Sequence, residues 1–291
     1  MRGMSDLHRA LDLTVDYLQR LKSEGHRYVC ISSETLASLT SAPSVANGEV
    51  SNSIVAADNG APSDLGIAES KPASLATAES PLTAESKAQA MADLRERALV
   101  CVKCPHLVKS RKNVVFGVGS IDAELMFVGE APGADEDVQG EPFVGAAGQL
   151  LTKMIQAMGL SRQTVYIANI LKCRPDTPGQ SYGNRKPTAD EMKTCIPYLH
   201  AQIDLIKPKV LVGLGATAIE GLLGAAGGIT KIRGIWQQYR GIPLMPTFHP
   251  SYLLRNQALT ERRKVWEDML HVMERIGLAI TDAQRKYFTK A

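Results

Sequence analysis

The sequence is poor in aromatic residues and holds no long apolar run. Phe, Trp and Tyr make up 5% of the 291 residues, which argues against an all-β sandwich with its large aromatic core. No apolar stretch approaches the roughly 20 residues that a membrane-spanning helix needs. Acidic residues interrupt every apolar stretch of the N-terminus, unlike a signal peptide. A hydrophobic content of 44% with 22% charged residues excludes wholesale disorder.

Cysteine is also scarce, and its pattern excludes a disulfide framework. The chain has 5 cysteines, an odd number, spread through a sequence without a secretion signal. This usage is typical of a reducing compartment. The sequence therefore predicts a soluble, cytoplasmic protein with no membrane association, and nothing in it indicates an oligomer, so we expect a monomer.

Charge is distributed unevenly along the chain. Residues 1–90 hold 7 Lys and Arg against 11 Asp and Glu, whereas the remainder holds 26 against 19. The basic surplus of the later part modestly favours a polyanionic partner. Many metabolic enzymes are equally basic, so this asymmetry carries little weight alone.

The first 90 residues divide into two segments. In 1–35, leucines and a valine recur at helical spacing between residues 5 and 24, which predicts a short amphipathic helix. That helix can rest on its own domain or dock on a protein partner. The segment 36–90 is rich in Ala, Ser, Thr and Pro and has no aromatic residue. It predicts a disordered linker, because it cannot bury enough surface to offset the entropy of ordering.

Residues 91–291 alternate between short apolar runs and helical patterns. Four runs read as buried strands, at 124–130, 164–170, 209–215 and 242–248. Helical patterns lie at 92–100 and near 146–158, 188–206, 216–223 and 258–276. This alternation predicts an α/β three-layer sandwich with a mostly parallel four- or five-stranded sheet and helices on both faces. Ligands of such sheets bind at the carboxyl ends of the strands.

The segment after the first predicted strand holds candidate catalytic groups. Glu130 leads into a Gly/Pro turn at 131–133, and acidic residues follow at 135–137. The turn can face a ligand with backbone N–H groups, and a carboxylate there can hold a water or a metal. The same cluster also fits a solvated loop capping the next helix. Phe143, a lone aromatic in the loop that follows, offers a flat face to a nucleobase.

Two further polar residues end other predicted strands. Asn169 carries paired donors and acceptors suited to a nucleobase edge, although Asn at a strand end is often only a turn former. His249 precedes a helix opened by proline. A lone histidine is usually structural, but these residues share one expected sheet edge with Glu130, which favours a common site.

Four of the cysteines form a second constellation. Cys101 and Cys104 make a CxxC pair, Cys173 and Cys195 follow, and Cys30 lies apart. Four thiolates can hold tetrahedral zinc or an iron–sulfur cluster, and spacing alone does not choose between them. A redox-active CxxC pair is a further interpretation. Basic residues that could face phosphates surround these cysteines in the sequence: Lys103, Lys109, Arg111, Lys112, Lys172, Arg174, Arg185 and Lys186.

Residues 101–276 closely resemble the family 4 (iron–sulfur) uracil-DNA glycosylases, within the uracil-DNA glycosylase superfamily. The matching pieces include Cys-x-x-Cys at 101–104, Gly-Glu-Ala-Pro-Gly at 129–133, Glu-Asp at 136–137, Gly-Glu-Pro-Phe-Val-Gly at 140–145, Tyr-Ile-Ala-Asn at 166–169, Lys-Cys-Arg-Pro at 172–175, Asn-Arg-Lys-Pro at 184–187, Cys195 and His-Pro-Ser-Tyr at 249–252. Several unrelated motifs in one order make the resemblance specific. It says nothing about residues 1–90.

The resemblance implies a uracil site and its chemistry. Phe143 would stack on an extruded uracil, Asn169 would bind its Watson–Crick edge, and His249 would donate to uracil O2 as negative charge develops there. Glu130 or Glu136 would position the attacking water. Main-chain groups of the turn would also contact the base, at Ala131, Pro132 and Gly133.

The resemblance also implies a cofactor and a DNA surface. The ligands of a [4Fe–4S] cluster would be Cys101, Cys104, Cys173 and Cys195. Residues against DNA phosphates would be Pro250, Ser251 and Arg255. The reaction would be hydrolysis of the N-glycosidic bond of uracil in single strands or U·G mismatches, which starts base-excision repair near the nucleoid.

Some features depart from the family, and other functions stay open. The Cys173–Cys195 interval is enlarged through 176–183, and Ala134 stands where some relatives carry an acid. Residues 170–194 lack the histidine of the covalently trapping relatives, so ordinary turnover is expected. The alternative function is a catalytically weak iron–sulfur protein that senses uracil while tethered to a repair or replication partner. A zinc-bearing nucleotide enzyme is a third.

Overall fold

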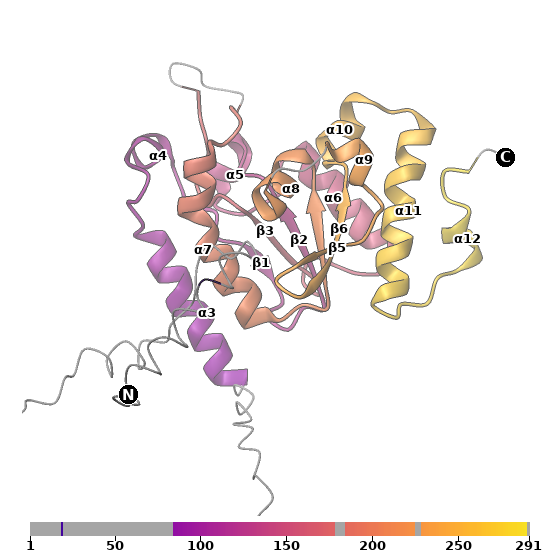
Figure 1. The fold of residues 1–291 in the computed structure, drawn as a ribbon, viewed down its shortest axis with the longest axis horizontal. Helices are drawn as coiled ribbons and strands as arrows, with labels where there is room; N and C mark the ends of the chain where they lie inside the picture. The colour runs from indigo at the N-terminus through magenta and orange to yellow at the C-terminus, as the bar shows by residue number, and fades with distance from the viewer. Residues whose placement is uncertain (1–18, 20–83, 178–183, 225–227, 290–291) are drawn as a thin grey trace, which may run out of the picture. The chain divides into compact units, whose positions relative to one another are not determined.

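The computed structural model describes residues 19, 84–177, 184–224 and 228–289 (Figure 1). The helix expected in 1–35 and the linker up to residue 83 lie outside the described residues, apart from residue 19. So do residues 178–183 of the enlarged loop. Within the part of the chain that is described, no helix is long and apolar enough to cross a membrane.

A mixed sheet of six described strands forms the centre of the domain, in the order β1-β3-β2-β4-β6-β5 (Figure 1). The four expected strands form its parallel middle: β2 (Leu125–Gly129), β3 (Tyr166–Asn169), β4 (Val210–Leu214) and β6 (Ile242–Thr247). The edge strands are antiparallel: β1 (Val118–Gly119) and β5 (Gln237–Tyr239). The prediction of four or five strands was too low, because strands this short leave no apolar run in the sequence.

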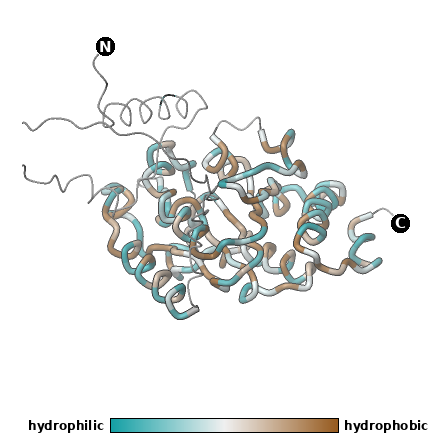
Figure 2. Tube along the Cα trace, turned by 60° about the horizontal axis from the view of Figure 1, so that its bottom comes forward, coloured by the Kyte–Doolittle hydropathy of each residue, from teal (hydrophilic) through white to brown (hydrophobic). Residues whose placement is uncertain are grey.

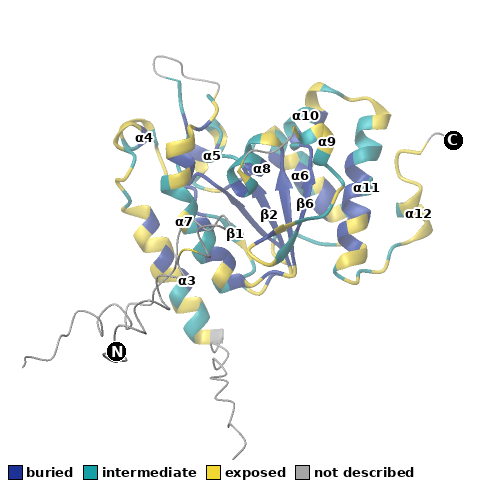
Figure 3. Cartoon of the chain, viewed as in Figure 1, coloured by how far each residue is buried: buried dark blue, intermediate teal, exposed yellow. Residues whose placement is uncertain are grey.

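Helices cover both faces of the sheet, as expected for a three-layer sandwich. The alternating residues of β2 divide between two cores: Met126 and Val128 face one, Leu125 and Phe127 the other. The first core packs under α3 (Ala84–Leu99), α7 (Ala189–Ile206) and α8 (Ala216–Leu223). The second packs under α6 (Ala146–Ala157) and α11 (Leu259–Arg275). Apolar and polar stretches alternate along these helices (Figure 2), and the central strands β2, β3 and β4 between them are buried (Figure 3).

Helix α3 begins at Ala84, whereas the sequence pattern predicts a helix at 92–100, so α3 takes in residues 84–90 of the segment expected as linker. Residues 84–90 were assigned to that linker for their small, polar composition. They are nevertheless mostly Ala, Glu, Lys and Gln, which are strong helix formers. Lys87 near the start of this helix pairs with Asp122 at 2.7 Å. The helix then buries Met91 and Leu94 against the first core.

The parallel strands bring the candidate site residues to one edge. Glu130 follows β2, Asn169 ends β3, and His249 follows β6 by two residues. Gly129 and Asn169 are direct partners in the sheet register. The remaining described helices are short and lie in connections: α4 (Pro105–Ser110), α5 (Ala134–Gln139), α9 (Ile229–Ile232), α10 (Pro250–Arg255) and α12 (Asp282–Arg285).

Candidate active site

The side chains of Asn169 and Phe143 converge over the backbone of Gly129. A Cβ atom on Gly129 would lie 2.3 Å from Oδ1 of Asn169 and 2.6 Å from Cζ of Phe143. Only glycine leaves this space free, because any side chain would collide with both groups. An aromatic ring and an amide thus meet at the ends of β2 and β3, where a planar polar ligand can be stacked and hydrogen-bonded.

Phe143 is held in an unusual backbone conformation. Its φ of +55° is in the left-handed region that side chains rarely adopt. Arg162 clamps this turn, donating from Nη1 to the Phe143 carbonyl at 3.1 Å and from Nη2 to the Pro142 carbonyl at 2.7 Å. A Cβ on Gly148 of α6 would lie 1.8 Å from the Phe143 carbonyl oxygen, so the helix fits flush against the turn. The buried ring is therefore fixed from two sides.

His249 lies beside Phe143 as a neutral imidazole. Its ring centroid lies 5.7 Å from that of Phe143. The Nδ1 atom accepts from the backbone N–H of Ser251 at 3.1 Å and lies 2.8 Å from the Ser251 hydroxyl. Burial, reinforced by the positive charge of Arg255, lowers the pKa of His249 to about 4. With Nδ1 accepting, the ring proton is assigned to Nε2, which makes Nε2 a neutral donor.

Glu136 in helix α5 is used as a structural staple. Its Oε2 accepts from the Gly133 N–H at 2.9 Å, and its Oε1 accepts from Val144 and Gly145 N–H groups at 3.0 and 3.1 Å. One carboxylate thus ties the 131–133 turn to the loop that carries Phe143. The acidic cluster is therefore more than the solvated loop that its composition also allowed.

Glu130, which directly precedes this turn, is also partly buried, but it is not the carboxylate that ties the turn to the Phe143 loop. Burial raises the pKa of Glu130, while a hydrogen bond from Thr217 and the charge of Lys186 oppose that rise. Lys186 also pairs with Glu220 at 2.6 Å, so it is shared between two carboxylates. A carboxyl group with a raised pKa at a strand end is suited to proton transfer.

The other predicted site residues lie in the two segments that flank this pocket. Ala131, Pro132 and Gly133 form the turn between β2 and α5, and Asn184 donates to the Pro132 carbonyl at 3.1 Å. Pro250 and Ser251 open α10, and Arg255 ends it with its side chain exposed. The structure therefore brings the turn, the aromatic ring, the amide and the histidine together.

The four cysteines line one small pocket, which they share with Arg111 and Tyr198. All four are free and partly buried. Arg111 Nη1 donates to Cys173 Sγ at 3.2 Å, and the Lys172 backbone N–H donates to Cys195 Sγ at 3.3 Å. Burial raises the pKa of Cys195 to about 11. Among the described residues, no three His, Cys, Asp or Glu side chains converge as the ligands of a single ion would.

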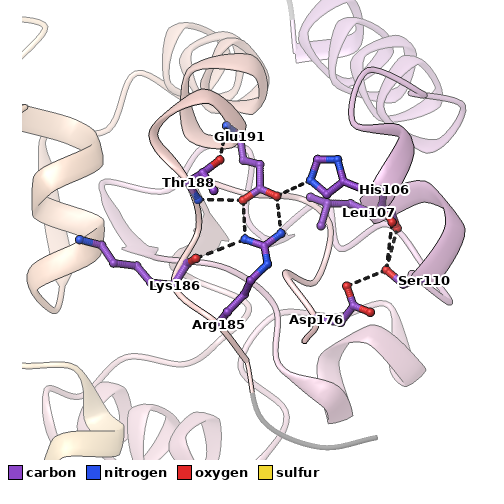
Figure 4. Close-up of polar contacts among 8 residues, drawn as sticks. All are labelled: His106, Leu107, Ser110, Asp176, Arg185, Lys186, Thr188 and Glu191. Carbon is purple, nitrogen blue, oxygen red and sulfur yellow. Dashed lines mark hydrogen bonds and ion pairs between the residues drawn. The ribbon is translucent and has the colours of Figure 1, made fainter. Parts of the chain in front are cut away.

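An ionic clamp joins the segments that carry these cysteines (Figure 4). Glu191 of α7, with 3% of its side chain exposed, accepts two bonds from Arg185 and lies 2.5 Å from His106 of α4. It also caps α7 with Thr188 in a reciprocal pair of hydrogen bonds. These contacts, with the Arg185 bonds foremost, lower the pKa of Glu191 to about 2. Helix α4 starts just after Cys104 and α7 carries Cys195, so the clamp holds both sides of the thiol pocket.

The prediction of a phosphate-facing surface is wrong for Lys172. This side chain is 2% exposed, and burial lowers the pKa of Lys172 to about 7. It lies inward because internal oxygens accept its hydrogen bonds. Arg185 and Lys186 are ion-paired, as described above, while Lys103, Lys109 and Lys112 are exposed.

Sequence reasoning missed three supporting residues. In the sequence Arg162 resembles any other charged residue, because no neighbouring residue indicates that it bonds the distant Phe143 carbonyl. Lys172 read as a surface charge. Glu191 had a detectable signal, because Thr188 and Glu191 form the T-x-x-E pattern of a capping box before an apolar helix.

Comparisons with known proteins agree with this geometry. A family model for the uracil DNA glycosylase superfamily matches residues 116–270, which include Phe143, Asn169 and His249. A type-4 uracil-DNA glycosylase from Thermotoga maritima is 46% identical over 187 residues, covering 63% of this chain and 93% of that protein. One from Sulfurisphaera tokodaii is 44% identical over 197 residues, covering 65% of this chain and 84% of that protein.

A more distant relative is a type-5 uracil-DNA glycosylase from Pyrobaculum aerophilum. It is 28% identical over 193 residues, covering 55% of this chain and 82% of that protein. The higher identities thus lie with the type-4 proteins, which confirms the resemblance found in the sequence.

Proposed function

The chain belongs to the uracil DNA glycosylase superfamily and to its type-4 members, and from that premise we propose how its residues excise uracil from DNA. It is a DNA glycosylase of base-excision repair, a hydrolase that cleaves the N-glycosidic bond of uracil. The observation that carries the proposal is the convergence of Asn169, Phe143 and His249 at the carboxyl ends of three strands.

In the proposed site, the three residues divide recognition from catalysis. The Phe143 ring stacks on the extruded base, and the Asn169 amide hydrogen-bonds its Watson–Crick edge. The His249 Nε2–H donates to uracil O2. When the bond between C1′ and N1 breaks, its electron pair passes to the base, and a neutral preorganised donor stabilises the resulting anion. Main-chain groups at 131–133 line the turn against the base.

Water attack is assigned to the carboxylate of Glu130. Water adds to C1′ and loses one proton to the carboxylate, so the products are free uracil and an abasic site. Glu136 was an equal candidate in the sequence. Both of its oxygens accept backbone N–H bonds, which supports Glu130 for this role.

The proposed substrates are those that release uracil most easily. Extruding a base from a duplex costs a few kcal/mol, and the cost is least for single strands and U·G mismatches. The strand would lie along α10, against Pro250, Ser251 and Arg255, of which only Arg255 supplies charge. The exposed Lys103, Lys109 and Lys112 would add sequence-independent attraction to phosphates.

We propose that Cys101, Cys104, Cys173 and Cys195 hold a [4Fe–4S] cluster. The four thiols line a pocket instead of converging on one point. A cluster requires such a spread of ligands, whereas a zinc ion would draw the sulfurs to about 2.3 Å from itself. The backbone N–H of Lys172 donates to Cys195, and its buried side chain has neutral hydrogen-bond acceptors, so an anionic cluster nearby would favour its charged form. When bound, the cluster serves structure and DNA orientation, because hydrolysis needs no electron transfer.

The proposed setting is a monomer that acts on nucleoid DNA and binds a protein partner through its N-terminal segment. The competing function is a weakly catalytic sensor of uracil. The presence of Glu130 beside the three pocket residues disfavours it, because binding alone requires no group for activating water.

The deciding experiment uses a single-stranded oligonucleotide with one uracil and a thymine control. Incubation with brown, iron-bearing protein, alkali treatment and a denaturing gel should yield a shortened product from the uracil strand alone. Intact DNA from protein of full iron content would instead favour the sensor. A colourless zinc protein would contradict the cluster.

A further inference from the structure

Lys172 is a buried residue that links the end of β3, which carries Asn169, to the thiol pocket. Its Nζ donates to the main-chain carbonyl of Asn169 at 2.9 Å, and its backbone N–H donates to Cys195 Sγ at 3.3 Å. The side chain thus folds back by three residues onto the end of β3. This residue joins the strand end that presents the Asn169 amide to the segment that carries the thiols.

The ammonium is anchored by a second buried polar residue. Lys172 Nζ donates to Gln202 Oε1 at 2.7 Å, and Gln202 Nε2 donates to the Phe116 carbonyl at 2.9 Å and to the Tyr166 hydroxyl at 3.0 Å. Lys172 also lies 5.9 Å from the centre of the Phe116 ring. Lys172, Gln202 and Tyr166 are all nearly inaccessible to solvent, so the network keeps one arrangement.

The network lies directly behind the base-recognition group. Ile170 N–H donates to the Gly129 carbonyl and Leu171 N–H to the Glu130 carbonyl, so β3 stays tied to β2 beyond Asn169. The Asn169 carbonyl is turned instead toward Lys172. Because the Asn169 side chain abuts Gly129 closely, a small tilt of this residue would misplace its amide.

We propose that Lys172 is a positioning residue: its ammonium fixes the main chain of Asn169 for uracil recognition, and its backbone N–H fixes Cys195. The inference rests on the proposed function, which assigns Asn169 to the uracil edge.

The test compares Lys172→Met with Lys193→Met in iron-loaded protein. Methionine keeps an apolar chain of similar length but removes the donors. Lys193 lies on α7 two residues before Cys195 and is exposed, so it is the matched control. The measurements are iron per chain, inhibition by free uracil, excision from the single-stranded uracil oligonucleotide, and binding of the thymine oligonucleotide.

Lys172→Met should weaken inhibition by free uracil about tenfold and lower kcat/KM by a similar factor, the loss expected for one misplaced hydrogen-bond group. Binding of the thymine oligonucleotide should not change, since the Lys172 side chain is buried and does not face DNA. Lys193→Met should leave uracil inhibition unaltered.

Unchanged uracil inhibition in folded, iron-loaded Lys172→Met would overturn the inference, as would an equal loss in thymine-strand binding. If that variant does not fold, Lys172→Gln keeps a polar side chain in the cavity, but its donor ends one atom short of the Nζ position that bonds the Asn169 carbonyl. A fall in uracil affinity there supports the inference, and wild-type affinity refutes it. Failure of the wild-type enzyme to excise uracil would count against the proposed function instead.

Discussion

Replacement of His249 by alanine is expected to slow excision strongly without unfolding the protein. The histidine offers one neutral donor from a partly buried ring. Removal of one such donor to a developing anion costs about 100- to 1000-fold in rate in comparable sites. Single-turnover cleavage of the uracil oligonucleotide measures the change. Circular dichroism and iron content serve as folding controls.

The pH dependence makes the same prediction sharper. Because the pKa of His249 is about 4, its Nε2–H is a neutral donor from about pH 5.5 to 8, so no rate inflection near 6.5 should come from this residue. A wild-type inflection near 6.5 that disappears in His249→Ala would refute the assignment of a neutral donor. A rate within fivefold of wild type in the folded variant would refute the role itself.

The lowered pKa of His249 also makes the free energy of unfolding depend on pH. In the unfolded chain His249 binds a proton below about pH 6.5, whereas in the folded protein it binds one only below about pH 4. The unfolded state therefore holds more protons between these two pH values. The free energy of unfolding therefore keeps its full value above pH 6.5, and it falls by up to about 3 kcal/mol as the pH falls toward 4. His249→Ala should flatten this part of the urea-unfolding profile.

Three further predictions concern the supporting residues. Arg162→Ala should free the Phe143 turn and lower kcat/KM for the uracil oligonucleotide about tenfold, because two carbonyl acceptors lose their donor; an unaltered kcat/KM would show that the turn holds itself. Glu191→Gln should lower the free energy of unfolding, measured by urea titration, by about 2 kcal/mol at neutral pH. The difference from wild type should shrink as the pH falls from 4.5 toward 2, because wild-type Glu191 protonates there. A difference that stays constant with pH would contradict the ionic clamp. Cys173→Ser should lower iron per chain and the visible absorbance relative to Cys30→Ser, and an unchanged spectrum would remove Cys173 from the ligand set.

Much of the fold was predictable because buried parallel strands are continuous apolar runs. Leu125–Gly129 and Val210–Leu214 are buried along their whole length, and such runs stand out in any sequence. The edge strands escaped because β1 has two residues and β5 three. The start of α3 was misplaced because small residues serve linkers and helices alike.

The site residues that end parallel strands were predictable, because the sheet topology brings the ends of such strands together. Asn169 and His249 end or follow parallel strands, so one edge of the sheet had to bring them together. The uses of charged side chains were not predictable in this way. Glu136 staples two loops and Lys172 points inward, because their partners come from distant segments or from main-chain groups.

The sequence by itself determined the alternating α/β pattern, the family motifs and the identity of the pocket residues, because periodicity and short motifs are local properties of the chain. Only the tertiary structure decided which nitrogen of His249 is free to donate and which carboxylate is already engaged. It also decided that one buried lysine joins the base pocket to the thiols. Protonation and hydrogen bonding depend on burial and on partners across the fold, and neither is written in neighbouring residues.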